Sequence, residues 1–117
     1  MANAYKILAQ HDGGTTPTTY TTSGVEAIIS SIVVANRTTA ARYFRVAVYP
    51  SGGSLGNSSY LAYNVDVAAN DVVTMTLGVT LADGDTLYLY GEDTNITINA
   101  FGTEISQQLN RSLSNGF

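Results

Sequence analysis

Six carboxylates between residues 66 and 93 are the side chains whose chemistry has to be weighed first. They are Asp66, Asp71, Asp83, Asp85, Glu92 and Asp93. Carboxylate oxygens bind calcium, and two facing carboxylates would serve glycoside hydrolysis. Their spacing matches no EF-hand loop and singles out no facing pair, and the chain has no tryptophan to line a sugar cleft. We therefore expect these acids to form turns through side-chain hydrogen bonds, and we expect no catalytic residue, metal or cofactor.

Two other segments have residue types that could do chemistry. His11 beside Asp12 could act as a general base, but no serine or cysteine motif accompanies the pair, so we expect His11 to be a solvated loop residue. The glycine-rich segment 52–56 follows Pro50, and no helical pattern comes after it. It therefore predicts a surface loop and not a phosphate-binding loop.

Composition limits the class of partner. Charged residues make up 12% of the 117 residues and the net charge is -4, which argues against binding to a nucleic-acid backbone. No apolar run is long enough to span a bilayer, and the N-terminal residues show no signal-peptide pattern, so we expect synthesis in a cytoplasm and no membrane association. The chain has no cysteine, so disulfides cannot stabilise its modest core. A surface with so few charges suits burial against neighbours in an assembly.

Alternation of apolar and polar residues dominates the chain, and helical patterns are nearly absent. Residues 25–36 carry apolar side chains on both faces, with Ile28, Ile32 and Val34 on one and Ile29 and Val33 on the other, which predicts a central strand. The Thr-rich stretch 15–24 predicts an edge strand or loop because it contains Pro17 and Gly24. The other expected strands cover residues 4–10, 42–49, 60–67, 72–81, 86–91 and 95–102.

About eight short strands at regular spacing predict an all-β, antiparallel β-sandwich of jelly-roll type. Gly78 suggests a bulge, and residues 83–85 suggest a tight hairpin-type turn. In the strand 60–67 we expect Leu61, Tyr63, Val65 and Val67 to share one face, and in the first strand Tyr5, Ile7 and Ala9. We expect one sandwich domain over residues 1–105 and a polar C-terminal arm over 106–117.

Tyrosines mark the most informative surface. Tyr43, Arg45 and Tyr49 alternate with the apolar residues of one expected strand, and Tyr88 and Tyr90 alternate with the leucines of another. If the aliphatic sides form the core, these five side chains lie on an outer sheet face. Tyrosine and arginine are enriched in protein–protein interfaces, although packing of the rings into the core remains an equal alternative. The arm adds Leu109, Leu113 and Phe117 as candidate interface residues.

Five segments between residues 4 and 106 match a known pattern: AYKILAQ, EAIISSIVVANR, RVAVYPSG, YLAYNVDVAANDVVTMTLGVTLADGDTLYLYG and NITINAFGTEIS. They resemble small virion structural proteins of tailed bacteriophages. These motifs are strand and turn patterns and carry no catalytic residues. The commoner pattern has a Val-Pro-Ala-Gly turn before the central strand where this chain has Thr21 to Gly24, and we expect the turn to persist because Gly24 remains.

The resemblance implies a virion protein made in the cytoplasm of the host bacterium. One implied role is a capsid decoration (cement) protein, a homotrimer that binds the major capsid protein on the outer surface and stabilises the shell. The other is a tail or baseplate component that binds tail proteins. A carbohydrate-binding module for host receptors is an alternative from another class, since jelly rolls also serve as lectins.

Overall fold

The computed structural model describes residues 4–12 and 16–106 and is built almost entirely of strands. The strands are β1 (Tyr5–His11), β2 (Thr18–Thr21), β3 (Val25–Asn36), β4 (Arg42–Tyr49), β5 (Tyr60–Val67), β6 (Val72–Leu81), β7 (Thr86–Gly91) and β8 (Ile96–Ser106). A single turn of 3₁₀ helix, η1 (Asn57–Ser59), precedes β5. In the described part of the chain, no helix is long and apolar enough to cross a membrane.

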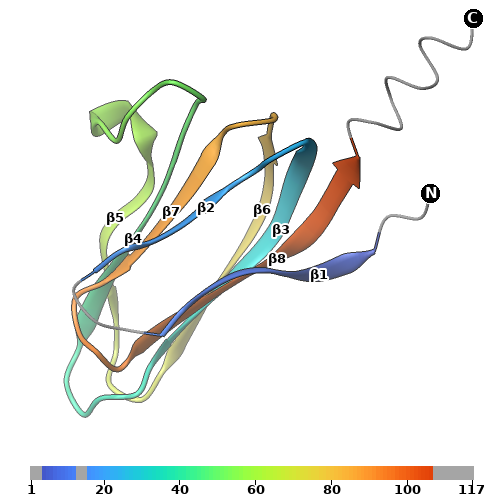
Figure 1. Cartoon of the computed structure of the whole chain (residues 1–117). Helices are drawn as coiled ribbons and strands as arrows, with labels where there is room; N and C mark the ends of the chain where they lie inside the picture. The colour runs from blue at the N-terminus through green and yellow to red at the C-terminus, as the bar shows by residue number, and fades with distance from the viewer. Residues whose placement is uncertain (1–3, 13–15, 107–117) are drawn as a thin grey trace, which may run out of the picture.

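The eight strands form two antiparallel four-stranded sheets, with strand orders β1-β8-β3-β6 and β2-β7-β4-β5 (Figure 1). Four of the strand pairings join the first half of the chain to the second half in nested order: β1 with β8, β2 with β7, β3 with β6 and β4 with β5. This is a hairpin ribbon folded over on itself, the arrangement of a jelly roll. The predicted all-β sandwich is therefore confirmed, as are the central place of β3 and the edge position of β2.

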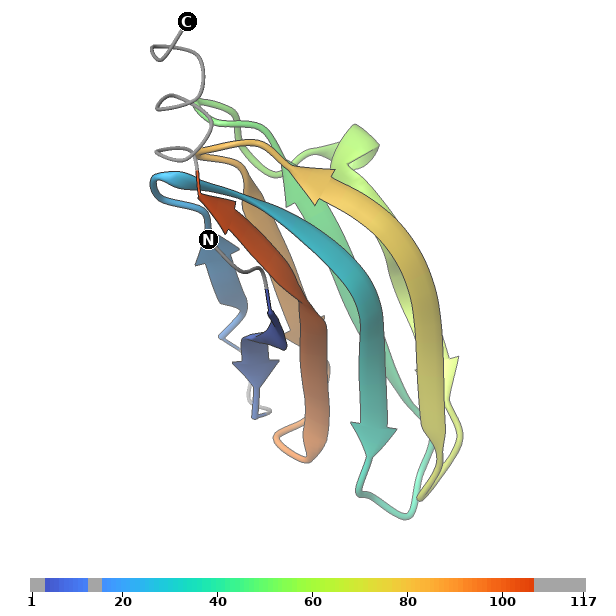
Figure 2. The ribbon, with the colours of Figure 1, turned by 90° about the vertical axis from the view of Figure 1, so that its right-hand side faces the viewer.

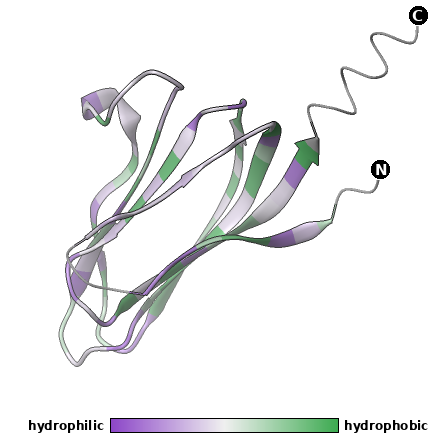
Figure 3. Cartoon of the chain, viewed as in Figure 1, coloured by the Kyte–Doolittle hydropathy of each residue, from purple (hydrophilic) through white to green (hydrophobic). Residues whose placement is uncertain are grey.

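The core lies between the two sheets. Most of its largest fully buried side chains come from the middle strands of each sheet: Ile29, Ile32, Phe44, Leu87, Leu89, Ile96 and Ile98. Figure 3 shows the corresponding hydrophobic bands across β3, β7 and β8. Branched aliphatic side chains suit a pleated surface packed on one side, so these segments form strands rather than helices.

A bulge in β3 changes which isoleucines reach the core. The pairing of β3 with both β6 and β8 shifts between Ile29 and Ser31, so Ile29 is buried on the same side as Ile32 while Ile28 faces outward. The predicted grouping of Ile28 with Ile32 was wrong because a bulge breaks the period of two. Gly78 lies in the matching irregular stretch of β6, as predicted.

Gly102 is required where β8 crosses this bulge. A Cβ atom placed on Gly102 would lie 1.9 Å from the backbone oxygen of Ile28, far inside van der Waals contact. At the turn before β3, Gly24 has a φ of +72°, so the glycine that we expected to preserve this turn does occupy a left-handed conformation.

Two other predictions about the strands were wrong. β1 is irregular between Ile7 and Ala9, so Tyr5 and Ile7 are exposed while Ala9 packs against the core. Residues 83–85 are not a hairpin turn, because β6 and β7 belong to different sheets. The turn there instead connects the two layers, with Gly84 at a φ of +92°.

Candidate functional site

The outer face of the β2-β7-β4-β5 sheet gathers the tyrosines that the sequence singled out. Arg45 on β4 pairs directly with Tyr90 on β7, and Tyr49 and Tyr88 follow on the same face of these two strands. The alternating Phe44, Val46, Leu87 and Leu89 are buried in the core. All five predicted residues are half-buried on the outer face, so the alternative that their rings fill the core does not hold.

Arg45 lies among three aromatic rings. The carbon of its guanidinium group is 4.4 Å from the centroid of the Tyr63 ring, 5.3 Å from that of Tyr90 and 5.4 Å from that of Tyr43. These distances are within the range of cation–π attraction. The Nε of Arg45 also donates a 2.6 Å hydrogen bond to Oδ1 of Asn64. Four side chains on three strands therefore hold the guanidinium in place.

A bulge in β5 supplies two of these contacts. The register between β4 and β5 shifts between Phe44 and Val46, so that Tyr63 and Asn64 together lie opposite Arg45. Asn64 has a φ of +52°, a left-handed conformation that asparagine tolerates better than most residues. The bulge turns the Tyr63 ring onto the outer face, where it is 55% exposed.

Tyr60 and Tyr63 could not be assigned to this face from the alternation of the sequence. Alternation predicts that Tyr63 shares one face with Leu61, Val65 and Val67, but only Val67 is buried. The clue was Asn64, a residue that disfavours strands and favours bulges, in the middle of an otherwise apolar segment. We define the tyrosine face as Tyr43, Arg45, Tyr49, Tyr60, Tyr63, Tyr88 and Tyr90.

The rings of the tyrosine face support one another. Tyr60 and Tyr63 meet edge to face with centroids 4.8 Å apart, and Tyr43 and Tyr90 lie 6.4 Å apart. Partial burial raises the pKa of Tyr88, and the neighbouring Tyr60 adds to this effect while Arg45 opposes it. Tyr88 is protonated at neutral pH, as any tyrosine with its ordinary pKa is, and can donate a hydrogen bond.

A shallow open depression of about 260 Å³ lies at one margin of the tyrosine face. Asn57, Tyr60 and Tyr63 line it, so it combines aromatic surface with an amide group. The depression could hold a small polar ligand or a side chain of a partner protein.

Four of the six carboxylates stabilise turns, as predicted, whereas Asp66 lies within β5 and Glu92 bonds to the amide of Tyr43. Oδ2 of Asp85 accepts a hydrogen bond from the amide of Ala82 at 2.9 Å, and its Oδ1 accepts one from Ser51 at the same distance. Oδ1 of Asp83 accepts from the amide of Gly24 at 2.8 Å. Asp71 and Asp93 bind backbone amides within two residues of themselves. Across residues 4–12 and 16–106, no group of three or more acidic or histidine side chains is arranged to hold a metal ion.

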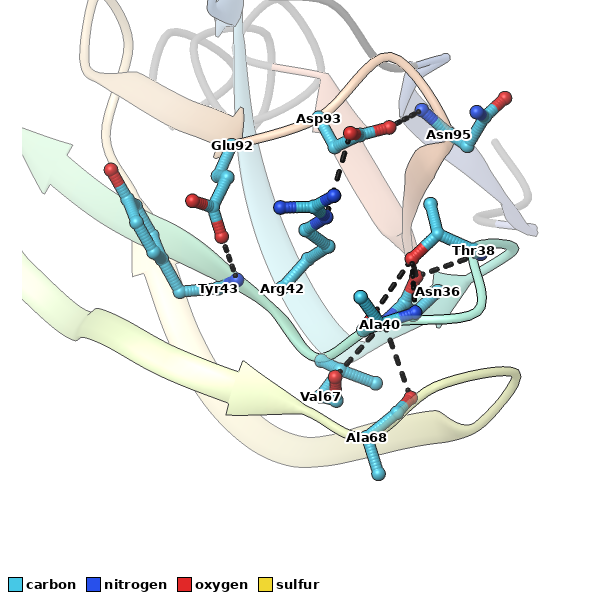
Figure 4. Close-up of polar contacts among 10 residues, drawn as sticks. All are labelled: Asn36, Thr38, Ala40, Arg42, Tyr43, Val67, Ala68, Glu92, Asp93 and Asn95. Atoms are coloured by element: carbon cyan, nitrogen blue, oxygen red, sulfur yellow. Dashed lines mark hydrogen bonds and ion pairs between the residues drawn. The ribbon is translucent and has the colours of Figure 1, made fainter.

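Figure 4 shows how polar groups close one end of the sandwich. The side-chain nitrogen Nδ2 of buried Asn36 donates to the backbone oxygens of Ala40 and Val67, both at 2.9 Å. Its Oδ1 accepts a hydrogen bond from the backbone amide of Thr38. Nearby, Oε1 of Glu92 accepts from the amide of Tyr43 at 2.9 Å. Arg42 and Asp93 form an ion pair with Nε and Oδ2 3.5 Å apart, too far for a strong hydrogen bond. These contacts fix the first residues of β4, the strand that carries Arg45.

His11 is buried, and the prediction that it is a solvated loop residue was wrong. It is 1% exposed at the end of β1, and its Nδ1 lies 2.9 Å from the hydroxyl of Thr18 on the other sheet. Burial lowers the pKa of His11, although Asp12 partly opposes this. The sequence lacked any indication of this role, because the partner hydroxyl comes from a strand in the opposite layer. His11 therefore joins the sheets as a neutral side chain.

A second polar link joins the two sheets near the far end of β8. Glu104 accepts a hydrogen bond from the hydroxyl of Tyr20 on β2 and pairs with Lys6 on β1. The bonds from Lys6 and Tyr20 lower the pKa of Glu104. Burial and the bond to Glu104 raise the pKa of Tyr20.

β8 extends to Ser106, and Leu109, Leu113 and Phe117 lie outside the described residues. Comparison with known proteins adds no assignment: no family model, no curated protein and no solved structure matches this chain.

Proposed function

We propose that the chain is a structural binding protein of a tailed-phage virion, a decoration protein that attaches to the capsid through its tyrosine face. The observation that carries the proposal is the guanidinium of Arg45 held among three tyrosine rings on an outer sheet face. The resemblance to phage virion proteins supplies the identity of the partner, and the jelly-roll fold is compatible with it because jelly rolls occur in viral capsid proteins.

The chemistry of this face suits a protein partner. Half-buried tyrosines offer apolar area at a low cost in conformational entropy, together with hydroxyl groups that form hydrogen bonds. None of the described carboxylates pairs with Arg45, so its remaining N–H groups can bind a carboxylate or backbone carbonyl of the capsid protein. Such a decoration protein stabilises the shell by mass action, because it binds the assembled lattice more tightly than free subunits.

A tail or baseplate protein is the alternative within the same class, since the same face would serve against tail proteins. Carbohydrate binding is a second candidate, favoured by the depression at Asn57, Tyr60 and Tyr63. Aromatic rings and an amide are groups that can contact the faces and hydroxyls of a sugar. A glycan array separates this candidate from the proposal, because a capsid decoration protein gives no saturable glycan signal.

Binding to shells tests the proposal directly. Purified chain is added to capsids of the parent phage that lack it, and bound protein is measured by co-sedimentation. We expect saturable binding that Arg45→Ala weakens by about tenfold, or roughly 1.4 kcal/mol. Arg37→Ala is the matched control because Arg37 is exposed and lies outside the tyrosine face. Equal binding by both variants would contradict a role for the tyrosine face.

A further inference from the structure

The two long sides of the sandwich differ in the side chains that cover the core. On the side formed by β1 and β2, polar side chains join the sheets, through His11 with Thr18 and Glu104 with Tyr20. The other side is formed by β5 and β6, the remaining edge strands of the two sheets. Figure 2 shows β1 and β6 at opposite margins of their sheet.

The β5/β6 side leaves core-facing residues partly uncovered. Val65 pairs with buried Phe44 and so faces inward, yet it is 37% exposed. Leu81 at the end of β6 is buried, but the other four inward residues of this strand are only half-buried, although all pack against the core: Val73, Met75, Leu77 and Val79. Inward residues of the neighbouring β3, such as Ile32 and Val34, are fully buried. Apolar area thus remains available along β6.

β6 lacks two of the features that normally prevent an edge strand from pairing, charge and proline, although its pairing with β3 is irregular at Leu77 and Gly78. Its ten residues, VVTMTLGVTL, include no charge and no proline. β2 is only four residues long, β1 carries Lys6, and β5 is interrupted by bulges and ends near Asp66. Short length, charge and bulges are the usual protection of sheet edges. Among the described strands, β6 has a neighbour only on its β3 side, so half of its backbone groups lack a strand partner.

We propose that β6 pairs antiparallel with β6 of a second copy of this chain, joining two four-stranded sheets into one. A two-fold axis near the middle of the strand, beside Thr76, would place uncharged residues opposite one another along the whole edge. Thr76, exposed on the outer face of β6, would then lie opposite Thr76 of the second copy, and threonine pairs across antiparallel strands are favourable. A second copy fits this edge because it offers an equally long strand with no like charges to repel.

This contact is separate from the tyrosine face, which belongs to the other sheet. It does not depend on the proposed function. It also joins chains in pairs, whereas the phage resemblance implies a trimer. Molecular mass therefore distinguishes the two associations. If the natural chain forms the dimer but does not bind capsids, the proposed function fails while the dimer proposal stands.

The experiment measures the mass of the full chain in solution by analytical ultracentrifugation. We expect a dimer at twice the chain mass of 12.3 kDa. Thr76→Lys and Thr76→Glu should each give a species of 12.3 kDa, because like charges would meet near the two-fold axis. An equimolar mixture of the two variants should restore the dimer, since opposite charges then face each other.

Thr94→Lys is the matched control, because Thr94 is exposed in the loop between β7 and β8. It should leave the dimer intact, and far-UV circular dichroism should show the same strand content in every variant. A monomer or trimer for the natural chain would overturn the proposal. A dimer that survives in both Thr76 variants, or a mixture that stays monomeric, would do the same.

Discussion

The guanidinium carbon of Arg45 lies 4.4 Å from the centre of the Tyr63 ring, on the neighbouring strand. This contact exists because the β5 bulge turns Tyr63 outward while Asn64 accepts the hydrogen bond from Arg45. The bulge therefore converts an edge strand into part of the tyrosine face.

Tyr63→Ala should weaken capsid attachment by about tenfold, since it removes both the cation–π contact and an exposed aromatic surface. Co-sedimentation with shells measures the change. Tyr5→Ala is the matched control, because Tyr5 is 80% exposed but lies on the other sheet. If the Tyr5 variant loses as much binding as the Tyr63 variant, attachment does not depend on the tyrosine face.

Asn36→Ala should lower the free energy of unfolding by at least about 2 kcal/mol, because it removes the buried bond to the backbone oxygen of Val67 together with the bonds to Ala40 and Thr38. Urea denaturation measures the change. Asn95→Ala, on an exposed side chain, should stay within about 0.5 kcal/mol of the natural chain. Similar losses in the two variants would mean that the Asn36 bonds contribute little.

Gly102→Ala should destabilise the fold by about 3 kcal/mol or more, because the added methyl group would collide with the backbone oxygen of Ile28. Gly78→Ala is the control, since no atom lies within 4 Å of the added Cβ. Thermal unfolding followed by circular dichroism compares them. A Gly102 variant as stable as the Gly78 variant would show that β3 and β8 do not approach so closely.

Glu104 should make stability depend on pH in the acid range. Its bonds to Lys6 and Tyr20 lower its pKa in the folded chain below the ordinary value of 4.5. Its contribution is therefore fully present above pH 4.5 and is lost as the pH falls through the folded pKa. Glu104→Gln should reduce stability at neutral pH by about 1 kcal/mol and flatten the acid limb of the stability curve.

Denaturant midpoints at several pH values test this prediction. Glu26→Gln is the comparison, because Glu26 lies on the outward face of β3 and makes no described ion pair. If the acid limb is equally steep in the Glu104 variant and the natural chain, the link between the sheets does not act through the Glu104 carboxylate.

The strand pattern could be predicted from the sequence because alternation in segments such as 42–49 and 86–91 follows directly from packing on one side. The same alternation placed Tyr43, Arg45, Tyr49, Tyr88 and Tyr90 on an outer face, where the structure has them. Turn positions followed from acids and glycines with strong local preferences.

The errors fall where long-range contacts override the local pattern. Bulges at Ser30 and at Asn64 shift the alternation by one residue, which moves Ile29 inward and Tyr63 outward. His11 is buried because Thr18, in the opposite layer, offers a hydroxyl to its ring. None of these effects follows from the spacing of residues within a single strand.

A cryo-EM map of the parent virion shows whether this chain attaches to the capsid through its tyrosine face. We expect many ordered copies of the jelly roll on the outer capsid surface, each with the β2-β7-β4-β5 sheet and Arg45 turned toward the major capsid protein. Particles without the chain, copies confined to the tail, or copies with the tyrosine face turned to solvent would contradict it.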